Sequence, residues 1–268
     1  LKNFSSIISS ATGKKIENEV IAQAAEFNIP SIQFVDNIYG WKSRLSYKKK
    51  TIFPDHLAVI NYACKKLAQK EGVPYKTIKV VGHPAWEKIG SIFYRKNTNT
   101  IFIGSPINEI YKNKLGYTEK EVWDMCIKAN KNYPSLIKNL KYLLHPMQKK
   151  PPYITNNYII KSLKNYKFYG QAIGIFSSLL TEAYLQGKKV ISIQPKKNKE
   201  DKWILSKLYN ENYVDSYTKL IAKLSEKNIN NKRLFYEMKD SKTRLFNLIV
   251  KESNTYIKTS HLYKNTFR

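Results

Sequence analysis

Short apolar segments alternate with helical patterns along most of the chain. In the first third, the apolar segments cover residues 7–10, 31–35, 56–60 and 78–81. Amphipathic segments at 16–27 and 62–71 separate them, and a basic, aromatic segment at 38–51 is typical of a loop. A short helix between two strands favours a parallel, right-handed unit. This part therefore predicts a Rossmann-like βα domain over residues 1–92.

A second series of the same kind follows a short polar segment at residues 90–98, which is typical of a hinge. Its predicted strands cover 100–103, 142–144, 172–176 and 190–193, and its predicted helices cover 118–130, 135–140, 154–163 and 178–186. The repetition predicts a second Rossmann-like domain over residues 98–226. The segment 227–268 is basic and carries spaced apolar residues, so it predicts a helical tail that packs back on the core.

The segment at residues 170–195 has the clearest pattern of strand, serine turn, helix and strand. Ser177 and Ser178 open the predicted helix, and hydroxyls with free backbone N–H groups at such a position suit a phosphate. Glu182 lies one turn beyond Ser178, where its carboxylate would accept hydrogen bonds from ribose or sugar hydroxyls. The alternative interpretation is that Ser177 is only a helix cap and Glu182 only a solvated side chain.

Polar residues also follow the predicted strands of the first domain, at the edge where parallel sheets bind ligands. Ser10 and Thr12 follow the first strand, and Asp36, a candidate general base, follows the second. The basic loop beyond it contains Lys42 and Arg44, which suit a phosphorylated acceptor or a lipid headgroup. As structural alternatives, Asp36 is a helix cap or ion-pair partner and the loop is merely solvated.

Two of the four histidines precede prolines at predicted strand ends, in Gly82-His83-Pro84 and in Leu144-His145-Pro146. A histidine near neutral pH acts as a base or donates a hydrogen bond to a phosphate. His83 and His145 are therefore candidates for catalysis and phosphate binding. The alternative is that each His-Pro pair only ends its strand.

The net charge of +27 favours anionic partners, such as nucleotide phosphates or an anionic membrane surface. The charge is mostly lysine and is spread along the chain beside abundant Asn, Ile and Tyr, which a coding bias toward A/T-rich codons explains equally well. No aromatic RNA-binding motif, zinc finger or arginine-rich helix is present, so we do not expect nucleic acid as a partner.

Several other classes of site are disfavoured by the sequence. Cys64 and Cys126 are far apart and lack metal-ligand spacing, so we expect no bound metal and a reducing, cytoplasmic compartment. No apolar stretch approaches the roughly 20 residues that a membrane helix needs. Neither GxGxxG nor GxxxxGK[ST] occurs, which disfavours NAD enzymes and P-loop NTPases.

The motifs at strand ends and serine turn occur in a familiar order along residues 7–195. They comprise Asn28-Ile29-Pro30-Ser31, Phe34-Val35-Asp36-Asn37, Ile78 to Pro84, Leu143-Leu144-His145-Pro146, and Phe176-Ser177-Ser178 to Ala183 with Gly187-Lys188-Lys189-Val190-Ile191. This order resembles GT-B-type glycosyltransferases and their relatives in polysaccharide and wall-polymer synthesis, which include CDP-glycerol glycerophosphotransferases and UDP-GlcNAc 2-epimerases. The sequence departs from that pattern where Leu143 and Leu144 replace the lysine-proline before the histidine.

The resemblance implies an α/β protein of two facing, doubly wound Rossmann-like domains, with a short or truncated N-terminal domain. It implies that Ser177, Ser178 and His145 bind the phosphates of a nucleoside-diphosphate donor and that Glu182 binds its hydroxyls. Catalytic residues would come from the first domain, where Asp36 and His83 are the candidates, and Ser10, Thr12, Lys42 and Arg44 are acceptor-side candidates. No cofactor is expected, since the nucleoside diphosphate is part of the substrate.

Three functions fit these implications. The leading one is transfer of a sugar or polyol phosphate from a nucleotide-sugar or CDP-polyol donor to a glycan or lipid-linked acceptor in surface polysaccharide synthesis. Such a protein would be cytoplasmic, with peripheral contact to the anionic inner face of the membrane. The second is a sugar-nucleotide 2-epimerase or hydrolase of the same fold, and the third is a nucleotide-sugar-binding protein without activity.

Overall fold

The computed structural model describes residues 4–12, 14–36, 40–90, 97–112, 114–160, 166, 168–195, 203–209, 211, 213–227 and 233–266. The chain forms two compact units. The first contains residues 1–87 together with 233–268, and the second contains residues 88–232. The C-terminal helices thus belong to the first unit.

A four-stranded parallel sheet forms the centre of the first unit. Its strands are β1 (Ile7–Ser10), β2 (Ser31–Val35), β5 (His56–Val59) and β6 (Ile78–Val80), in the order β1-β2-β5-β6. Helices α1 (Lys15–Glu26) and α3 (Tyr62–Lys70) make two of the crossovers. The predicted strands and helices of this region, and their parallel pairing, are confirmed to within one or two residues at each end.

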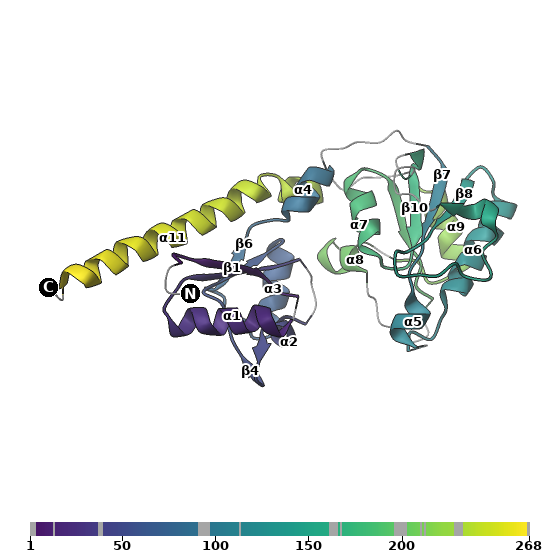
Figure 1. Ribbon diagram of the computed structural model, residues 1–268. Helices are drawn as coiled ribbons and strands as arrows, with labels where there is room; N and C mark the ends of the chain where they lie inside the picture. The colour runs from purple at the N-terminus through teal and green to yellow at the C-terminus, as the bar shows by residue number, and fades with distance from the viewer. Residues whose placement is uncertain are drawn as a thin grey trace. The chain divides into compact units, whose positions relative to one another are not determined.

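The two faces of this sheet are covered by different parts of the chain. The strand order advances in one direction only, and right-handed crossovers then place α1 and α3 on the same face. The opposite face is covered by α11 (Ser241–Thr266), as Figure 1 shows. Leu245, Leu248 and Ile249 of α11 pack there, with Phe34, against a small buried cluster of Ile32, Ala58 and Val81. Their spacing of three and four residues gives the helix an apolar stripe.

The basic segment predicted as a loop contains regular structure. It forms α2 (Trp41–Arg44) and a two-stranded hairpin of β3 (Ser46–Tyr47) and β4 (Lys50–Thr51), joined through left-handed residues Lys48 and Lys49. Buried Asn18 of α1 donates from Nδ2 to the carbonyl oxygens of Arg44 and Ser46, at 2.8 and 3.0 Å. The loop prediction was therefore wrong, because burial of Trp41 and these hydrogen bonds order the segment.

The second unit contains a five-stranded parallel sheet. Its strands are β7 (Asn99–Ile103), β8 (Lys138–Leu143), β9 (Ile159–Ile160), β10 (Gln171–Gly174) and β11 (Lys189–Ser192), in the order β11-β10-β7-β8-β9. Its core includes Phe102, Trp123 and Tyr142, whose rings pack with centroids 5.3–5.4 Å apart.

The remaining helices are short except for one. They are α4 (Pro84–Gly90), α5 (Ile107–Tyr111), α6 (Glu119–Asn132), α7 (Ser178–Leu185), α8 (Ile204–Tyr209), α9 (Tyr217–Ser225) and α10 (Arg233–Met238). The helix predicted at 118–130 is confirmed as α6, and a capping box begins it: the Thr118 hydroxyl accepts from the N–H of Glu121, and the Glu121 carboxylate accepts from the N–H of Thr118. In the part of the chain that the structure describes, no helix has the length and apolar character to cross a membrane.

Two predicted helices of the second unit were wrong. Residues 135–140 lead into strand β8, and the carbonyl oxygen of Ile137 is held by Nδ2 of Asn130 at 2.8 Å. Residues 154–160 form a short 3₁₀ turn (Asn156–Tyr158) and β9, while 161–165 lie outside the described residues. Both segments are short and apolar, and pairing with neighbouring strands overrides their helical spacing.

Candidate functional site

The strand order of the second unit identifies the edge at which a ligand is expected. From β7 the chain moves to β8 and β9 on one side, and then returns to β10 and β11 on the other. The order therefore reverses between β7 and β10. In open parallel sheets, ligands bind outside the carboxyl ends of the strands at such a reversal. The four described strands of the first sheet show no reversal.

The turns that follow β7 and β10 flank this position. Gly104 directly follows β7, and a Cβ there would lie 2.8 Å from both the carbonyl oxygen of Leu143 and the Tyr142 hydroxyl. After β10, Ser177 caps α7 by accepting a hydrogen bond from the N–H of Leu179 at 3.3 Å. Ser178, the first residue of α7, is exposed. The serine turn predicted as a phosphate site thus lies where the strand order reverses. Ser177 also caps the helix, as the alternative interpretation proposed.

Glu182 is one helical turn beyond Ser178 and is half-buried. Burial raises the pKa of its carboxyl group, and no hydrogen bond lowers it again. Among the described residues, no side chain or backbone N–H donates to this carboxylate. A half-buried acid without a donor from the protein is suited to hydroxyl groups of a ligand.

His145 follows β8, the strand next to β7. Its Nδ1 accepts a hydrogen bond from the backbone N–H of Met147 at 3.2 Å. In the neutral ring the proton is then on Nε2, which becomes a hydrogen-bond donor. This donor follows β8 and the serine turn follows β10, with β7 between the two strands, and a donor at this edge fits the predicted contact with a phosphate.

A buried carboxylate that the sequence interpretation missed joins the turns after β7 and β8. Glu119 is 2% exposed and accepts hydrogen bonds from the N–H of Ser105, from Nε2 of Gln148 at 2.5 Å and from the Tyr153 hydroxyl at 2.9 Å. Burial raises the pKa of Glu119, and these hydrogen bonds partly oppose the rise. Glu119 opens α6, so its sequence position indicated only a favourable helix dipole.

On the first unit, Asp36 and His83 follow β2 and β6 at the carboxyl edge of the sheet. The His83 ring stacks on Trp86 with centroids 4.5 Å apart, and its Nδ1 accepts from the N–H of Trp86 at 3.3 Å. Burial lowers the pKa of His83, and the charge of Asp36 opposes this shift. Phe34, two residues before Asp36, has its ring centroid 5.6 Å from that of His83, so the two catalytic candidates lie in neighbouring parts of this sheet edge.

Ser10 and Thr12 bind a carboxylate of the chain itself. The Ser10 hydroxyl donates to Oε1 of Glu17 at 2.6 Å, and the N–H of Thr12 donates to Oε2 at 2.8 Å. Burial raises the pKa of Glu17, but the hydrogen bonds from Ser10 and Thr12 outweigh it, so the pKa lies below its ordinary value. Glu17 thus occupies the anion position at the N-terminus of α1.

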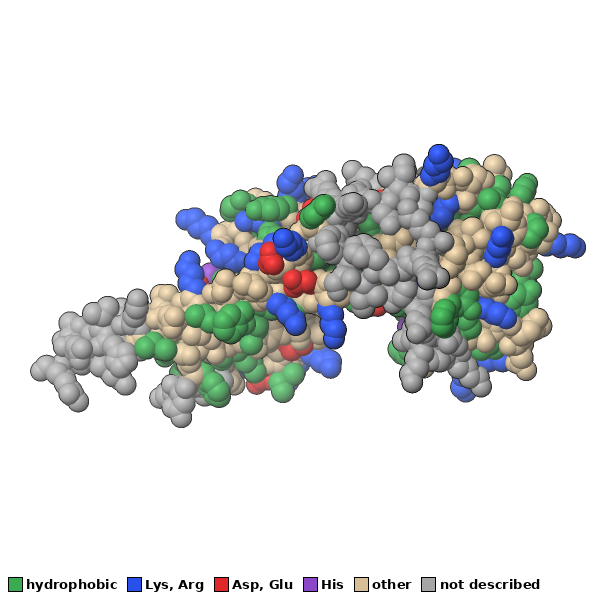
Figure 2. All heavy atoms as spheres, turned by 90° about the horizontal axis from the view of Figure 1, so that it is seen from above, with side chains coloured by type: hydrophobic (Ala, Val, Ile, Leu, Met, Phe, Trp, Pro, Cys, Tyr) green, Lys and Arg blue, Asp and Glu red, His purple; other side chains and the backbone are tan. Residues whose placement is uncertain are grey.

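The two basic candidates of the first unit differ in placement. Arg44 donates from Nη1 to the carbonyl oxygen of Ala11 at 3.0 Å, which holds it at the end of β1. Lys42 is exposed. On the face seen in Figure 2, other Lys and Arg side chains are scattered among apolar ones.

Within the described residues, no three His, Cys, Asp or Glu side chains gather as the ligands of a metal ion would.

Comparison with known proteins identifies the fold. Neither the family models nor the curated proteins match the sequence. Among solved structures, UDP-GlcNAc 2-epimerase from Methanocaldococcus jannaschii matches 92% of this chain and 77% of its own, with a TM-score of 0.58 and 14% identity. A Listeria monocytogenes protein assigned as a UDP-N-acetylglucosamine 2-epimerase matches 94% of this chain and 75% of its own, with a TM-score of 0.58 and 10% identity. The predicted α/β class, with Rossmann-like units of a GT-B-like fold, is confirmed.

Proposed function

We propose that the protein binds a nucleoside-diphosphate sugar at the carboxyl edge of the second sheet and acts on its sugar. The observation that carries the proposal is Glu182, a half-buried carboxylate without a donor among the described residues, beside the strand-order reversal. Partial burial makes the charged carboxylate less stable, and hydrogen bonds from ribose or sugar hydroxyls would stabilise it.

The other residues of this edge would hold the diphosphate. The N-terminus of α7 presents its first N–H groups there, with the hydroxyl of Ser178 exposed beside them. Nε2 of His145 would donate to a phosphate oxygen. Together with lysines, these groups would stabilise the charge on a leaving diphosphate. No separate cofactor is part of the proposal.

Transfer of the sugar or polyol phosphate to an acceptor is one candidate reaction. Asp36 would take the proton of the acceptor hydroxyl, and the neutral His83 ring would donate a hydrogen bond. The acceptor would be a glycan or a lipid-linked glycan. The pair of neighbouring acid and imidazole groups at one sheet edge supports this assignment.

Epimerisation or hydrolysis of the nucleotide sugar is the second candidate reaction. The two solved structures described above carry the name UDP-GlcNAc 2-epimerase, which favours UDP-GlcNAc as the first substrate to test. This reaction would need no acceptor and no membrane.

Product analysis separates the two candidates. The purified chain is incubated with UDP-GlcNAc, and separately with CDP-glycerol, with and without a glycan acceptor. UDP released from UDP-GlcNAc, or CMP released from CDP-glycerol, only when acceptor is present supports transfer, whereas a free or epimerised sugar formed without acceptor supports the second reaction. Asp36→Asn should abolish the turnover that depends on an acceptor. Binding without any turnover would refute both reactions while leaving the binding site standing.

A further inference from the structure

A pocket lies at the amino edge of the first sheet, the edge opposite to Asp36 and His83. It has a volume of about 570 Å³ and lies between the end of α1, the starts of β5 and β6, and α11. The lining residues that matter chemically are Asn28, Asp55, His56, Lys76, Thr77 and Glu252. Its volume is in the range of small-molecule sites. Ligands of the parallel sheet itself bind at the carboxyl edge, so this pocket belongs to neither candidate site described above.

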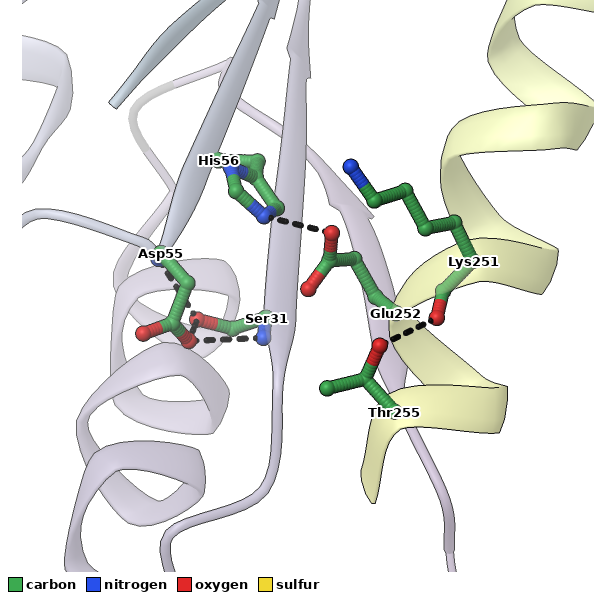
Figure 3. Close-up of polar contacts among 6 residues, drawn as sticks. All are labelled: Ser31, Asp55, His56, Lys251, Glu252 and Thr255. Atoms are coloured by element: carbon green, nitrogen blue, oxygen red, sulfur yellow. Dashed lines mark hydrogen bonds and ion pairs between the residues drawn. The ribbon is translucent and has the colours of Figure 1, made fainter. Parts of the chain in front are cut away.

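Two carboxylates line the pocket, and each has one oxygen that accepts no hydrogen bond from the described residues. Oδ2 of Asp55 accepts hydrogen bonds from the N–H and the hydroxyl of Ser31, at 2.9 and 2.8 Å. Oε1 of Glu252 lies 3.0 Å from Nε2 of His56, as Figure 3 shows. Among the described residues, neither Oδ1 of Asp55 nor Oε2 of Glu252 accepts a hydrogen bond. Two acceptors of negative charge are therefore open to a ligand.

His56 holds one of these carboxylates in place. Its Nε2 lies 3.0 Å from Oε1 of Glu252, so in the neutral ring Nε2 carries the proton and Nδ1 is an acceptor. Nδ1 is buried and has no hydrogen-bond partner in the described part of the chain, and a ligand in the pocket does not reach it. His56 therefore orients Glu252 and does not itself bind the ligand.

The local charge favours a cation although the whole chain is strongly basic. The C-terminal end of α1 borders the pocket at Ala25 and Asn28, and the last turn of this helix has no basic residue. That end carries the negative pole of the helix dipole. Two carboxylates and one exposed lysine, Lys76, line the pocket. Cations are thus attracted here and repelled over most of the surface.

Groups that bind hydroxyls complete the lining. The Asn28 amide and the Thr77 hydroxyl border the pocket, and neither side chain makes a hydrogen bond with the described residues. We propose that this pocket binds a small, polyhydroxylated primary amine of the amino-sugar class. Its ammonium group binds Asp55 and Glu252, and its hydroxyls bind Asn28 and Thr77.

Titration of the full-length chain with glucosamine tests the proposal, followed by NMR of the ¹⁵N-labelled protein below the pKa of the sugar's amino group. N-acetylglucosamine is the neutral control, because acetylation removes the positive charge of the amine and keeps the ring hydroxyls. We expect saturable shifts around residues 28, 77 and 252 with glucosamine and none with N-acetylglucosamine. Glu252→Gln, which keeps an acceptor for His56, should weaken binding by about tenfold, the size of one charge-assisted hydrogen bond. Asp124→Asn, in an exposed ion pair on the second unit, should leave it unchanged.

Lys76→Ala should tighten glucosamine binding by a few-fold, because it removes the one lysine that lines the pocket. A misfolded variant would bind more weakly, so tighter binding cannot result from misfolding. The proposal is overturned if glucosamine gives no saturable shift, or if N-acetylglucosamine binds equally well. It is also overturned if Glu252→Gln binds as the wild type does or if Lys76→Ala binds more weakly.

Discussion

The backbone N–H of Trp86 donates a hydrogen bond to Nδ1 of His83 at 3.3 Å, and this contact decides which ring nitrogen carries the proton. The N–H of Met147 makes the same contact with His145 at 3.2 Å. Both His-Pro turns thus keep Nδ1 as an acceptor and Nε2–H as a donor. In the neutral form these histidines donate hydrogen bonds, so we assign proton removal to Asp36 instead.

The first prediction concerns the pH dependence of folding. Because the pKa of His83 is lowered below its ordinary value of 6.5 in the folded chain, the unfolded chain binds more protons near that pH. The stability that His83 contributes is complete above pH 6.5 and is lost as the pH falls through the lowered pKa. Urea unfolding of wild type and His83→Gln over this range should give a shallower decline in the variant. If the free energy of unfolding fell equally with pH in both proteins, the lowered pKa of His83 would be contradicted.

The second prediction concerns the cost of Glu182. The pKa of the Glu182 carboxyl group is raised above the ordinary 4.5 in the folded protein. The charged form therefore lowers the free energy of unfolding, and this loss is complete at neutral pH. Glu182→Gln should leave the free protein as stable or more stable, by up to about 1 kcal/mol after allowance for solvent exposure. Denaturation without ligand at neutral pH and near pH 4.5 measures this. The gain should disappear at the lower pH, and a destabilised variant would show that Glu182 has a structural partner.

The third prediction tests how tightly α11 holds the turn of His83. Gly82 has a φ of +87°, and a Cβ there would lie 2.6 Å from Nη2 of Arg244 and 2.8 Å from Cβ of Ser241. Nε of Arg244 also donates to the carbonyl oxygen of Val81 at 3.0 Å. Gly82→Ala should therefore destabilise the protein by about 2–4 kcal/mol through backbone strain and overpacking together.

Gly72 provides the matched control for that substitution. Its φ is +92°, but nothing lies within 4 Å of an added Cβ. Gly72→Ala should cost only the strain, about 1–2 kcal/mol. Equal losses in the free energy of unfolding for the two variants would mean that α11 does not restrain the Gly82 turn.

The fourth prediction concerns the buried acid beneath the candidate nucleotide site. Glu119→Ala leaves the donors of Ser105, Gln148 and Tyr153 without their acceptor, at a cost of about 3 kcal/mol. Glu121→Ala removes an exposed carboxylate from the same helical turn and should cost about 1 kcal/mol as a lost cap. Chemical denaturation compares them, and similar losses would contradict a special role for Glu119.

The sequence predicted most of the parallel strands because their apolar runs are bounded by strong signals. The helix after Ser177, for instance, has a serine cap at one end and Gly187 at the other. The failures were short segments without such signals. Residues 135–140 lead into strand β8, whose partner β7 lies some forty residues earlier in the chain, and a local pattern does not contain that information.

The site residues also divide into those with a local sequence signal and those that depend on distant parts of the chain. Ser177, His145, Asp36 and His83 could be proposed because they follow predicted strands, which fixes their edge of the sheet. Glu119 could not, since its burial depends on Gln148 and Tyr153, which lie 29 and 34 positions away. Ser10 and Thr12 were predicted to face an acceptor, but the sequence did not reveal that Glu17 takes their hydrogen bonds.

Calorimetric titration of UDP-GlcNAc into the full-length chain tests the central claim most directly. The wild type and Asp124→Asn, whose exposed ion pair lies on α6, should bind the nucleotide sugar at one site with equal affinity. Glu182→Gln should bind at least about tenfold more weakly, because it loses charge-assisted hydrogen bonds to hydroxyls of the ligand. Equal affinity of wild type and Glu182→Gln, or no binding of any uridine or cytidine diphosphate sugar or polyol, would contradict the account.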